Sequence, residues 1–158
     1  MRILVVSDTH GDEGALWRAL EAQPAARTVI HLGDGVREAE DMAARFPEKT
    51  FYIVRGNCDF RSAAGHLPYV QEEVCGGKRL FFTHGHLYGV KSDLYRVCCA
   101  ARERQADVLL FGHTHRPLAT YDDGLYLFNP GSLYGGGTYG VLDITAAGVV
   151  MNVVEVRT

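Results

Sequence analysis

The sequence predicts an α/β protein in which parallel strands are followed by antiparallel ones. In the first third of the chain, short apolar runs at 3–6, 28–32 and 51–54 alternate with helical patterns at 13–23 and 36–46. Strands that alternate with helices in this way are typical of a parallel sheet. The last third contains strand-like runs and turn residues without a helical pattern. We therefore expect a mixed sheet.

Each of the two early helical patterns has one apolar side. Apolar residues recur at spacings of three and four, which places them on one face of a helix. They are Ala15, Leu16, Ala19 and Leu20 in the first pattern, and Val36, Ala39, Ala43 and Phe46 in the second. We expect these faces to pack against the sheet.

The middle of the chain changes character. Apolar runs at 79–83 and 108–111 predict two further strands, and Gly76-Gly77 lies between strand-like segments, as is typical of a hairpin turn. Residues 91–105 have an amphipathic pattern and predict a third helix. Its apolar positions are Leu94, Val97, Cys98 and Ala101.

Two hairpins are predicted near the end of the chain. Residues 118–129 contain Asp123-Gly124, and residues 137–156 contain Ala147-Gly148, each pair between two strand-like runs. An Asp-Gly pair favours the positive φ angles of a tight hairpin turn. No linker or repeat divides the sequence, so a single domain over 1–158 is expected.

Length and charge limit the classes of function. A chain of 158 residues can bury roughly two-thirds of its unfolded surface, which is enough for a complete core. The net charge is −3 and the basic residues are scattered, so sequence-specific binding of nucleic acid is not expected. No apolar run has the length of a membrane span or of a signal-peptide core. We expect a cytoplasmic protein that does not contact a membrane.

The four cysteines are expected to be free thiols. Cys58, Cys75, Cys98 and Cys99 form no C-x-x-C pair and have no spacing typical of a disulfide framework. A reducing compartment also disfavours disulfides.

Side chains that can bind a metal follow the predicted strands. They are Asp8, His10, Asp34, Asn57, His84, His113 and His115. The carboxyl ends of parallel strands meet along one edge of a sheet, so residues far apart in sequence converge there. The D-x-H and H-x-H pairs place two donors at i and i+2. In an extended turn both would point to one side, with Thr9 or Thr114 pointing away.

The donor set indicates two divalent ions. Four imidazoles, two carboxylates and a carboxamide exceed the four ligands of a structural zinc site. The mixture of nitrogen and oxygen favours Mn²⁺, Fe²⁺, Ni²⁺, Co²⁺ or Zn²⁺ over Ca²⁺. Two ions that share a carboxylate can activate a water and hold phosphoryl oxygens. Asp34 is the candidate for the shared carboxylate.

These motifs resemble those of the calcineurin-like metallophosphoesterases. The series is D-x-H at Asp8, G-D at Asp34, G-N-x-D at Asn57, H-G-H at His84 and G-H-x-H at His113. The likeness is greatest to the YfcE-type branch of small phosphodiesterases, and it includes G-H-T-H-R-P and N-P-G-S. It covers residues 3 to about 156. The resemblance implies a four-layer αββα sandwich with two mixed β-sheets.

The resemblance also implies a role for each residue of the site. One ion would be held by Asp8, His10, Asp34 and His115, and the other by Asp34, Asn57, His84 and His113. The residues expected to take part in catalysis are Asp34, Asn57, Cys58, Asp59 and His84. Mn²⁺ is expected first, with Ni²⁺, Fe²⁺, Co²⁺, Zn²⁺ or Mg²⁺ as alternatives.

Cys58 and Asp59 stand beside the proposed ligand Asn57. Asp59 is expected to accept a hydrogen bond from a histidine or from the backbone. Cys58 occupies the position at which many relatives have a histidine that assists the leaving group or binds phosphate. Without that acid, phosphodiesters and activated esters are favoured over alkyl monoesters.

Polar residues outside the motifs receive other interpretations. His31 is expected in the core with hydrogen bonds, and His66 at the surface. For His86 the alternatives are that it orients a ligand or touches substrate, and a place beside a ligand or at the surface is favoured. The arginines near the motifs in sequence can pair with a phosphate. They are Arg55, Arg61 and Arg116.

The expected function is hydrolysis of a phosphodiester bond in a small phosphorylated substrate. A metal-bound hydroxide would attack phosphorus in line with the leaving oxygen. The alternatives are a phosphomonoesterase, a catalytically silent protein-binding scaffold of the same fold, and a metal-dependent hydrolase of another bond. A nuclease of the same superfamily is disfavoured because the chain has no basic stripe. The sequence is compatible with a small homo-oligomer.

Overall fold

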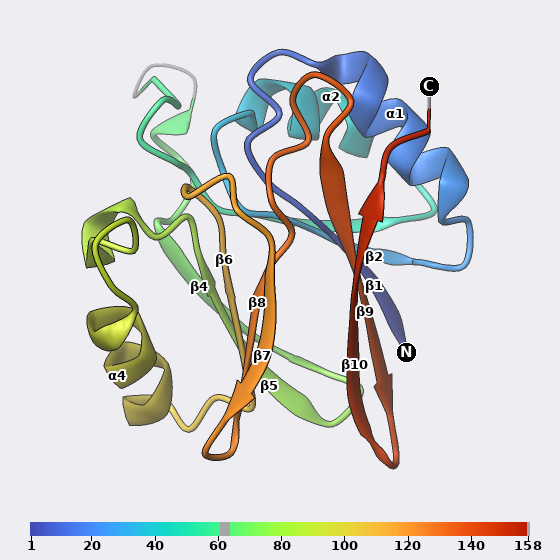
Figure 1. The fold of residues 1–158 in the computed structure, drawn as a ribbon. Coiled ribbons are helices and arrows are strands. Elements are labelled where there is room, and N and C mark those ends of the chain that lie inside the picture. The colour runs from blue at the N-terminus through green and yellow to red at the C-terminus, as the bar shows by residue number, and fades with distance from the viewer. Residues whose placement is uncertain (61–63, 158) are drawn as a thin grey trace.

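The computed structural model describes residues 1–60 and 64–157. In this part of the chain, three α-helices and one 3-10 helix connect two five-stranded sheets (Figure 1). The helices are α1 (Glu13–Ala22), α2 (Val36–Arg45), η1 (His86–Tyr88) and α4 (Tyr95–Glu103). The first sheet contains β1 (Arg2–Val6), β2 (Thr28–His31), β3 (Thr50–Ile53), β9 (Thr138–Thr145) and β10 (Gly148–Glu155). The second contains β4 (Val70–Cys75), β5 (Lys78–Thr83), β6 (Val108–Phe111), β7 (Leu118–Asp122) and β8 (Leu125–Asn129).

Both sheets are mixed. In the first, with order β10-β9-β1-β2-β3, strands β1, β2 and β3 are parallel, and β9 runs antiparallel to β1. In the second, with order β4-β5-β6-β8-β7, the three central strands are parallel and both edge strands are antiparallel. The predicted α/β fold with mixed sheets is confirmed.

The two sheets pack face to face, and the helices cover their outer faces (Figure 1). Alternate residues of a strand point to opposite faces. Ile3 of β1 therefore packs with Phe82 of β5 and Leu110 of β6 between the sheets. The next residue, Leu4, packs with Leu16 of α1 on the outside. Helix α4 covers the outer face of the second sheet, which completes the predicted αββα sandwich.

Two helices differ in detail from the sequence prediction. Helix α4 begins at Tyr95 rather than at Lys91, because the Asp93 carboxylate accepts a hydrogen bond from the Tyr95 amide at 2.9 Å and ends the preceding turn. In α2 the buried residue of the second turn is Met42, while Ala43 is half-buried. None of the described helices is long and apolar enough to cross a membrane.

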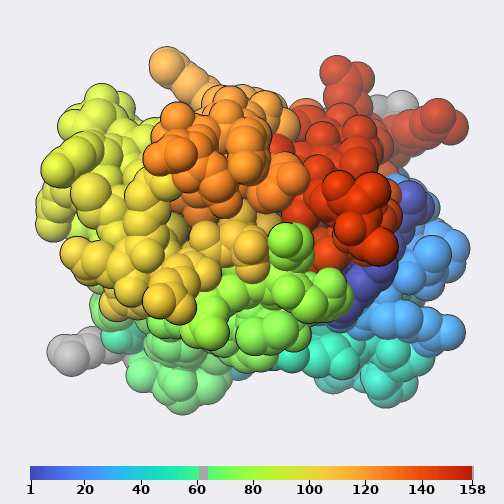
Figure 2. Space-filling model, turned by 90° about the horizontal axis from the view of Figure 1, so that it is seen from below, coloured from blue at the N-terminus to red at the C-terminus, as the bar shows by residue number. Residues whose placement is uncertain are grey.

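The three predicted hairpin turns are present, and all of them lie at one end of the sandwich. Both residues of Gly76-Gly77 have positive φ, at 57° and 79°, and so do both residues of Asp123-Gly124, at 42° and 82°. These turns precede β5 and β8, and the β9–β10 turn lies beside the start of β1. They gather on the face seen in Figure 2. The carboxyl ends of the parallel strands lie at the opposite end.

Candidate metal centre

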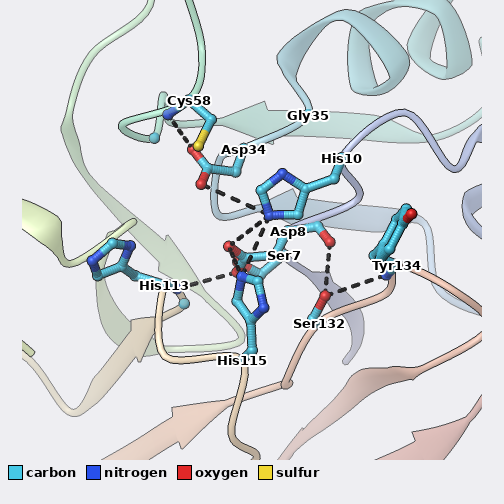
Figure 3. Close-up of polar contacts among 12 residues, drawn as sticks. Ser7, Asp8, His10, Asp34, Gly35, Cys58, His113, His115, Ser132 and Tyr134 are labelled. Atoms are coloured by element: carbon cyan, nitrogen blue, oxygen red, sulfur yellow. Dashed lines mark hydrogen bonds and ion pairs between the residues drawn. The ribbon is translucent and has the colours of Figure 1, made fainter. Parts of the chain in front are cut away.

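The seven predicted ligands follow strand ends of both sheets. Asp8 and His10 follow β1, Asp34 follows β2, Asn57 follows β3, His84 follows β5, and His113 and His115 follow β6. The first sheet contributes the carboxylates, one histidine and the asparagine, while the second contributes three histidines. The structure brings all of these side chains into one cluster. Figure 3 shows five of them, Asp8, His10, Asp34, His113 and His115.

Asp8, His10 and His115 form the first group of donor atoms. His115 Nε2 lies 3.0 Å from Asp8 Oδ1, and His10 Nε2 lies 3.7 Å from the same oxygen. The two Nε2 atoms are 3.4 Å apart. The other oxygen of Asp8 accepts hydrogen bonds from the Ser7 hydroxyl and from the His113 amide. Oδ1 of this fully buried carboxylate is thereby directed at the imidazoles.

His84 is the centre of the second group. Its Nε2 lies 3.1 Å from Asn57 Oδ1, 3.1 Å from His113 Nδ1 and 3.3 Å from Asp34 Oδ2. Its Nδ1 donates to the Leu32 carbonyl at 2.8 Å. This hydrogen bond sets the orientation of the ring, so that Nε2 faces the other donors.

Asp34 lies where the two groups meet. Its Oδ2 is 3.3 Å from His84 Nε2 and 4.0 Å from His10 Nε2. Its Oδ1 accepts a hydrogen bond from the Cys58 amide at 2.8 Å. Asp8 Oδ1 is also 4.0 Å from His84 Nε2, but its closer contacts belong to the first group.

The donor atoms fit divalent cations. In each group, the histidine and carboxylate donor atoms lie within 4.8 Å of one another, as ligands of one ion do when each bond is about 2.1 Å. Two contacts join ring nitrogens of histidine pairs, His10 with His115 and His84 with His113. A shared cation would accept the lone pairs of both nitrogens, whereas a hydrogen bond uses only one.

Most of the ligand positions have an unusual backbone conformation. The φ angles are 55° at Asp8, 44° at His10, 56° at Asp34, 65° at His113 and 59° at His115. Residues other than glycine rarely adopt this left-handed region, and when they do they cluster at functional sites.

The expectation that D-x-H and H-x-H form extended turns was therefore wrong. The donors nevertheless converge, because the backbone turns at both residues of each pair. The intervening hydroxyls point elsewhere, as predicted. Thr9 Oγ1 lies 3.2 Å from His31 Nε2, and Thr114 Oγ1 accepts from Asn129 Nδ2 at 3.0 Å.

Glycines allow the strand ends to approach one another closely. A Cβ atom at Gly56 would overlap Oδ1 of Asp34, and one at Gly112 would overlap the Ser7 hydroxyl. A side chain at Gly56 would displace Asp34, and one at Gly112 would displace Ser7, whose hydroxyl donates to Asp8.

Asp59 connects two backbone segments, residues 34–36 and the loop that contains Gly56. Its Oδ2 accepts hydrogen bonds from the amides of Asp34 at 2.8 Å and Gly56 at 2.7 Å. Its Oδ1 accepts from Gly35 at 2.9 Å and Val36 at 3.0 Å, at the start of α2. The prediction that Asp59 accepts hydrogen bonds from the backbone is confirmed.

Cys58 is exposed beside the cluster, and all four cysteines are free. Desolvation of the thiol and the neighbouring Asp34 carboxylate raise the pKa of Cys58 to about 11, so the sulfur is protonated at neutral pH. Sγ also lies within 4.8 Å of donor atoms of His10 and Asp34, which the sequence did not predict. A cavity of about 310 Å³ opens here, lined by these residues and Phe60.

The metal-free cluster holds opposite charges at its centre. Burial would raise the pKa of Asp34, but the hydrogen bond and charge of His84 outweigh it and keep that pKa well below its usual range. Burial would likewise lower the pKa of His84, but Asp34 raises it. Burial and the charge of His84 lower the pKa of His113 to about 4, so its imidazole is neutral at pH 7 with a lone pair to donate.

The other three histidines lie in different places. His31 is fully buried, and its Nδ1 accepts a hydrogen bond from the Gly33 amide at 3.1 Å, which confirms the predicted core histidine. His66 is at the surface, 2.7 Å from Glu40, as predicted. His86 is half-buried, with its ring centroid 5.4 Å from that of His84, so it lies beside a predicted ligand.

The three arginines that were predicted to bind phosphate do not lie together. Arg61 lies outside the described residues. Arg116 is exposed beside the H-x-H segment. The Arg55 guanidinium stacks on the Tyr69 ring, 3.8 Å from its centroid.

Sequence reasoning missed several residues that support the cluster. Asn129 is fully buried, and its Nδ2 holds the Gly112 carbonyl at 3.1 Å. The Ser132 hydroxyl donates to the Asp8 carbonyl at 3.0 Å (Figure 3). The N-P-G-S motif, which contains both residues, was the available signal, but it suggested no role for either side chain. The Tyr134 ring meets the His10 ring edge-on at 6.2 Å, and no sequence pattern indicated it.

The fold and this cluster define a member of the calcineurin-like phosphoesterases. Residues 1–147 match the model of the calcineurin-like phosphoesterase superfamily domain. The chain therefore belongs to this family, and its geometry agrees with the motif order by which the resemblance was first inferred.

Two relatives and one solved structure are similar to this chain over most of its length. The chain is 35% identical to the phosphodiesterase YfcE of Escherichia coli K12, over 95% of this chain and 91% of that protein. It is 35% identical to the probable metallophosphoesterase YsnB of Bacillus subtilis, over 84% of this chain and 75% of that protein. A predicted phosphoesterase from Streptococcus pneumoniae superposes with a TM-score of 0.83 at 24% identity, covering 98% of this chain and 88% of that one. The last comparison supports the fold.

Proposed function

We propose that this chain is a phosphodiesterase that uses two divalent metal ions to hydrolyse a small phosphorylated substrate. The observation that carries the proposal is the meeting of two groups of donor atoms at the Asp34 carboxylate. Membership of the phosphoesterase family supports hydrolysis of a phosphoester, and the likeness to a protein named a phosphodiesterase favours a diester.

The ligand sets follow the two groups. Asp8, His10, Asp34 and His115 would hold one ion, and Asp34, Asn57, His84 and His113 would hold the other. When bound, the ions would supply Lewis acidity and lower the pKa of a coordinated water. Mn²⁺ is the proposed metal on the strength of the family resemblance, and the mixed nitrogen and oxygen donors are compatible with it as well as with Fe²⁺, Ni²⁺, Co²⁺ or Zn²⁺.

The remaining residues of the site position these ligands. The Leu32 carbonyl orients His84, and Asp59 holds the amides on both sides of Asp34. These hydrogen bonds hold the ligand loops in position before substrate binds. Less free energy is then needed to reorganise the site during the reaction.

The chemistry of Cys58 favours substrates with good leaving groups. In the metal-free site burial and the Asp34 carboxylate raise the pKa of the Cys58 thiol, and Cys58 takes the place of an imidazole that could protonate a departing alkoxide. Diesters and activated esters need this proton least. The cavity beside Cys58 offers about 310 Å³ for one ester group of such a substrate.

The test is hydrolysis by purified protein that has been stripped of metal and reloaded with Mn²⁺, Mg²⁺, Ni²⁺ or Zn²⁺. Bis(p-nitrophenyl) phosphate serves as the diester and p-nitrophenyl phosphate as the monoester. We expect metal-dependent hydrolysis with the diester preferred. Preference for the monoester would support a phosphatase. Absence of both metal uptake and hydrolysis would support a scaffold.

A cytoplasmic location and a small homo-oligomer stay predictions.

A further inference from the structure

Two buried side-chain atoms in the described part of the chain have no hydrogen-bond partner. They are Nε of Arg55 and Nδ1 of His86. Buried polar groups without a partner are uncommon in native proteins, because each loses its hydrogen bonds to water without replacing them. Such atoms indicate a place where a ligand or a water completes the hydrogen bonding.

Both residues lie at the same edge of the metal centre. The His86 ring centroid is 5.4 Å from that of His84 and 6.1 Å from that of His113. On its other side, the His86 ring meets the edge of Tyr69 at 5.6 Å. Tyr69 is the ring on which the Arg55 guanidinium stacks. Arg55, Tyr69 and His86 therefore form a continuous group that ends at two predicted ligands.

This group is anchored to the ligand loops. The Arg55 amide donates to the Pro68 carbonyl at 3.0 Å, and the Thr83 hydroxyl donates to the Tyr69 carbonyl at 2.9 Å. Thr83 directly precedes His84. Arg55 directly precedes Gly56, whose backbone packs against the loop that contains Asp34. The distance from the guanidinium to the metal centre is thus set by short, hydrogen-bonded segments.

The guanidinium has no acidic partner among the described residues. The arginine and lysine side chains that do form ion pairs there are Arg2, Arg45, Lys78, Arg102 and Arg104. Arg55 instead has an aromatic face on one side, which holds its plane and leaves its N–H edge for an anion. A planar guanidinium with free N–H groups is well suited to phosphoryl oxygens.

We propose that Arg55 and His86 form the subsite that binds the phosphoryl oxygens of the substrate, with Tyr69 as the platform that positions Arg55. The inference rests on the proposed function, because it names the part of that active site which recognises the substrate. Arg55 carries a permanent positive charge and selects an oxyanion over a neutral ester. The subsite therefore favours phosphoesters over carboxylic esters, a distinction that the metal ligands alone do not make.

The test is a calorimetric titration of Mn²⁺-loaded protein with inorganic phosphate, together with the metal content of each variant. Arg55→Met should weaken phosphate binding by at least about tenfold, because a charge-assisted hydrogen bond is lost. Arg55→Lys should recover part of the affinity. Tyr69→Phe keeps the ring and should bind phosphate like the wild type, whereas Tyr69→Leu should weaken binding. Arg96→Met, which removes an exposed charge on α4, is the matched control and should change nothing.

Several results would overturn the subsite. The first is that the wild-type protein binds no phosphate. The second is that Arg55→Met binds phosphate as tightly as the Arg96→Met control. Loss of bound metal in Arg55→Met and Arg55→Lys alike would assign Arg55 to the metal centre instead. The proposed function fails separately. If wild-type protein hydrolyses no phosphoester while phosphate binding still depends on Arg55, the subsite stands and the proposed reaction does not.

Discussion

Nε2 of His84 lies 3.3 Å from Oδ2 of Asp34, and both side chains are almost completely removed from solvent. In the metal-free protein each of the two stabilises the charge of the other. Asp34 is held ionised and the pKa of His84 is raised. Asp34 and His84 would both hold the second ion, whose positive charge would take the place of the proton on His84.

Asp34→Asn tests this arrangement. The amide keeps the size of the side chain but loses its negative charge, so we expect metal affinity to fall by more than the roughly 10–100-fold typical of losing an outer-shell partner. Hydrolysis of the diester should be lost together with the metal. Metal content by mass spectrometry and turnover are measured on the same sample. A variant with near-wild-type turnover and one ion lost would rule out a shared carboxylate.

Gly56→Ala tests the close approach of two ligand loops. The added methyl group would overlap Oδ1 of Asp34 and displace its carboxylate. Overpacking of this kind costs roughly 1–3 kcal/mol, so both metal affinity and the free energy of unfolding should fall. The control is Gly14→Ala in α1, where the nearest side-chain atom would be 3.4 Å away at the flexible end of Arg18. That variant should keep its metal affinity and have a stability unchanged or raised by up to about 1 kcal/mol. Equal metal affinity in the two variants would contradict the prediction.

Cys58→His tests the role of the residue beside Asn57. An imidazole can protonate a departing alkoxide, so turnover of diesters with poor leaving groups should rise toward the roughly 10²–10⁴-fold that a positioned acid contributes. Turnover of bis(p-nitrophenyl) phosphate should change much less. Cys58→Ser should keep the wild-type activity. If activity collapses in the serine variant, the thiol takes part directly in the reaction.

His31 makes the metal-free fold sensitive to acid. Burial lowers the pKa of this histidine, and the carboxylates of Asp59, Glu38 and Asp8 only partly oppose it. Below a pH of about 6.5 the unfolded chain binds a proton at His31 that the folded chain excludes, so the free energy of unfolding falls as the pH falls. The contribution is at most about 1.4 kcal/mol per pH unit.

The measurement is urea unfolding of metal-free wild-type and His31→Asn protein at about pH 7.5 and about pH 5.5. The asparagine oxygen can still accept the hydrogen bond of the Gly33 amide. The variant should lose less stability on acidification than the wild type does. The same loss in both proteins would show that another group is responsible.

Much of the fold follows from local patterns that the sequence displays openly. Apolar runs that end in glycine and a polar residue marked the strands of the parallel core, and paired turn residues such as Asp123-Gly124 marked the hairpins. The start of α4 did not follow, because one hydrogen bond from Tyr95 to Asp93 decides it. The partition of the strands into two sheets came from the family resemblance, since strand periodicity does not show which sheet a strand joins.

The candidate site was predictable in its membership but not in its geometry. The seven ligands were predicted from their residue types and from their positions at strand ends. The left-handed backbone at residues such as Asp8 and His113 had no local signal, because tertiary contacts impose it. Tyr69 and Asn129 support the site through contacts with residues distant in sequence, to Thr83 and Gly112, and no short motif indicates such contacts.

The most direct test of the binuclear centre is a stoichiometric titration of metal-stripped protein with Mn²⁺, in which bound metal and hydrolysis of bis(p-nitrophenyl) phosphate are followed together. Two groups of donors that share Asp34 predict binding of two ions per chain, with full activity reached only after the second. Saturation of binding and activity at a single ion per chain would contradict this account.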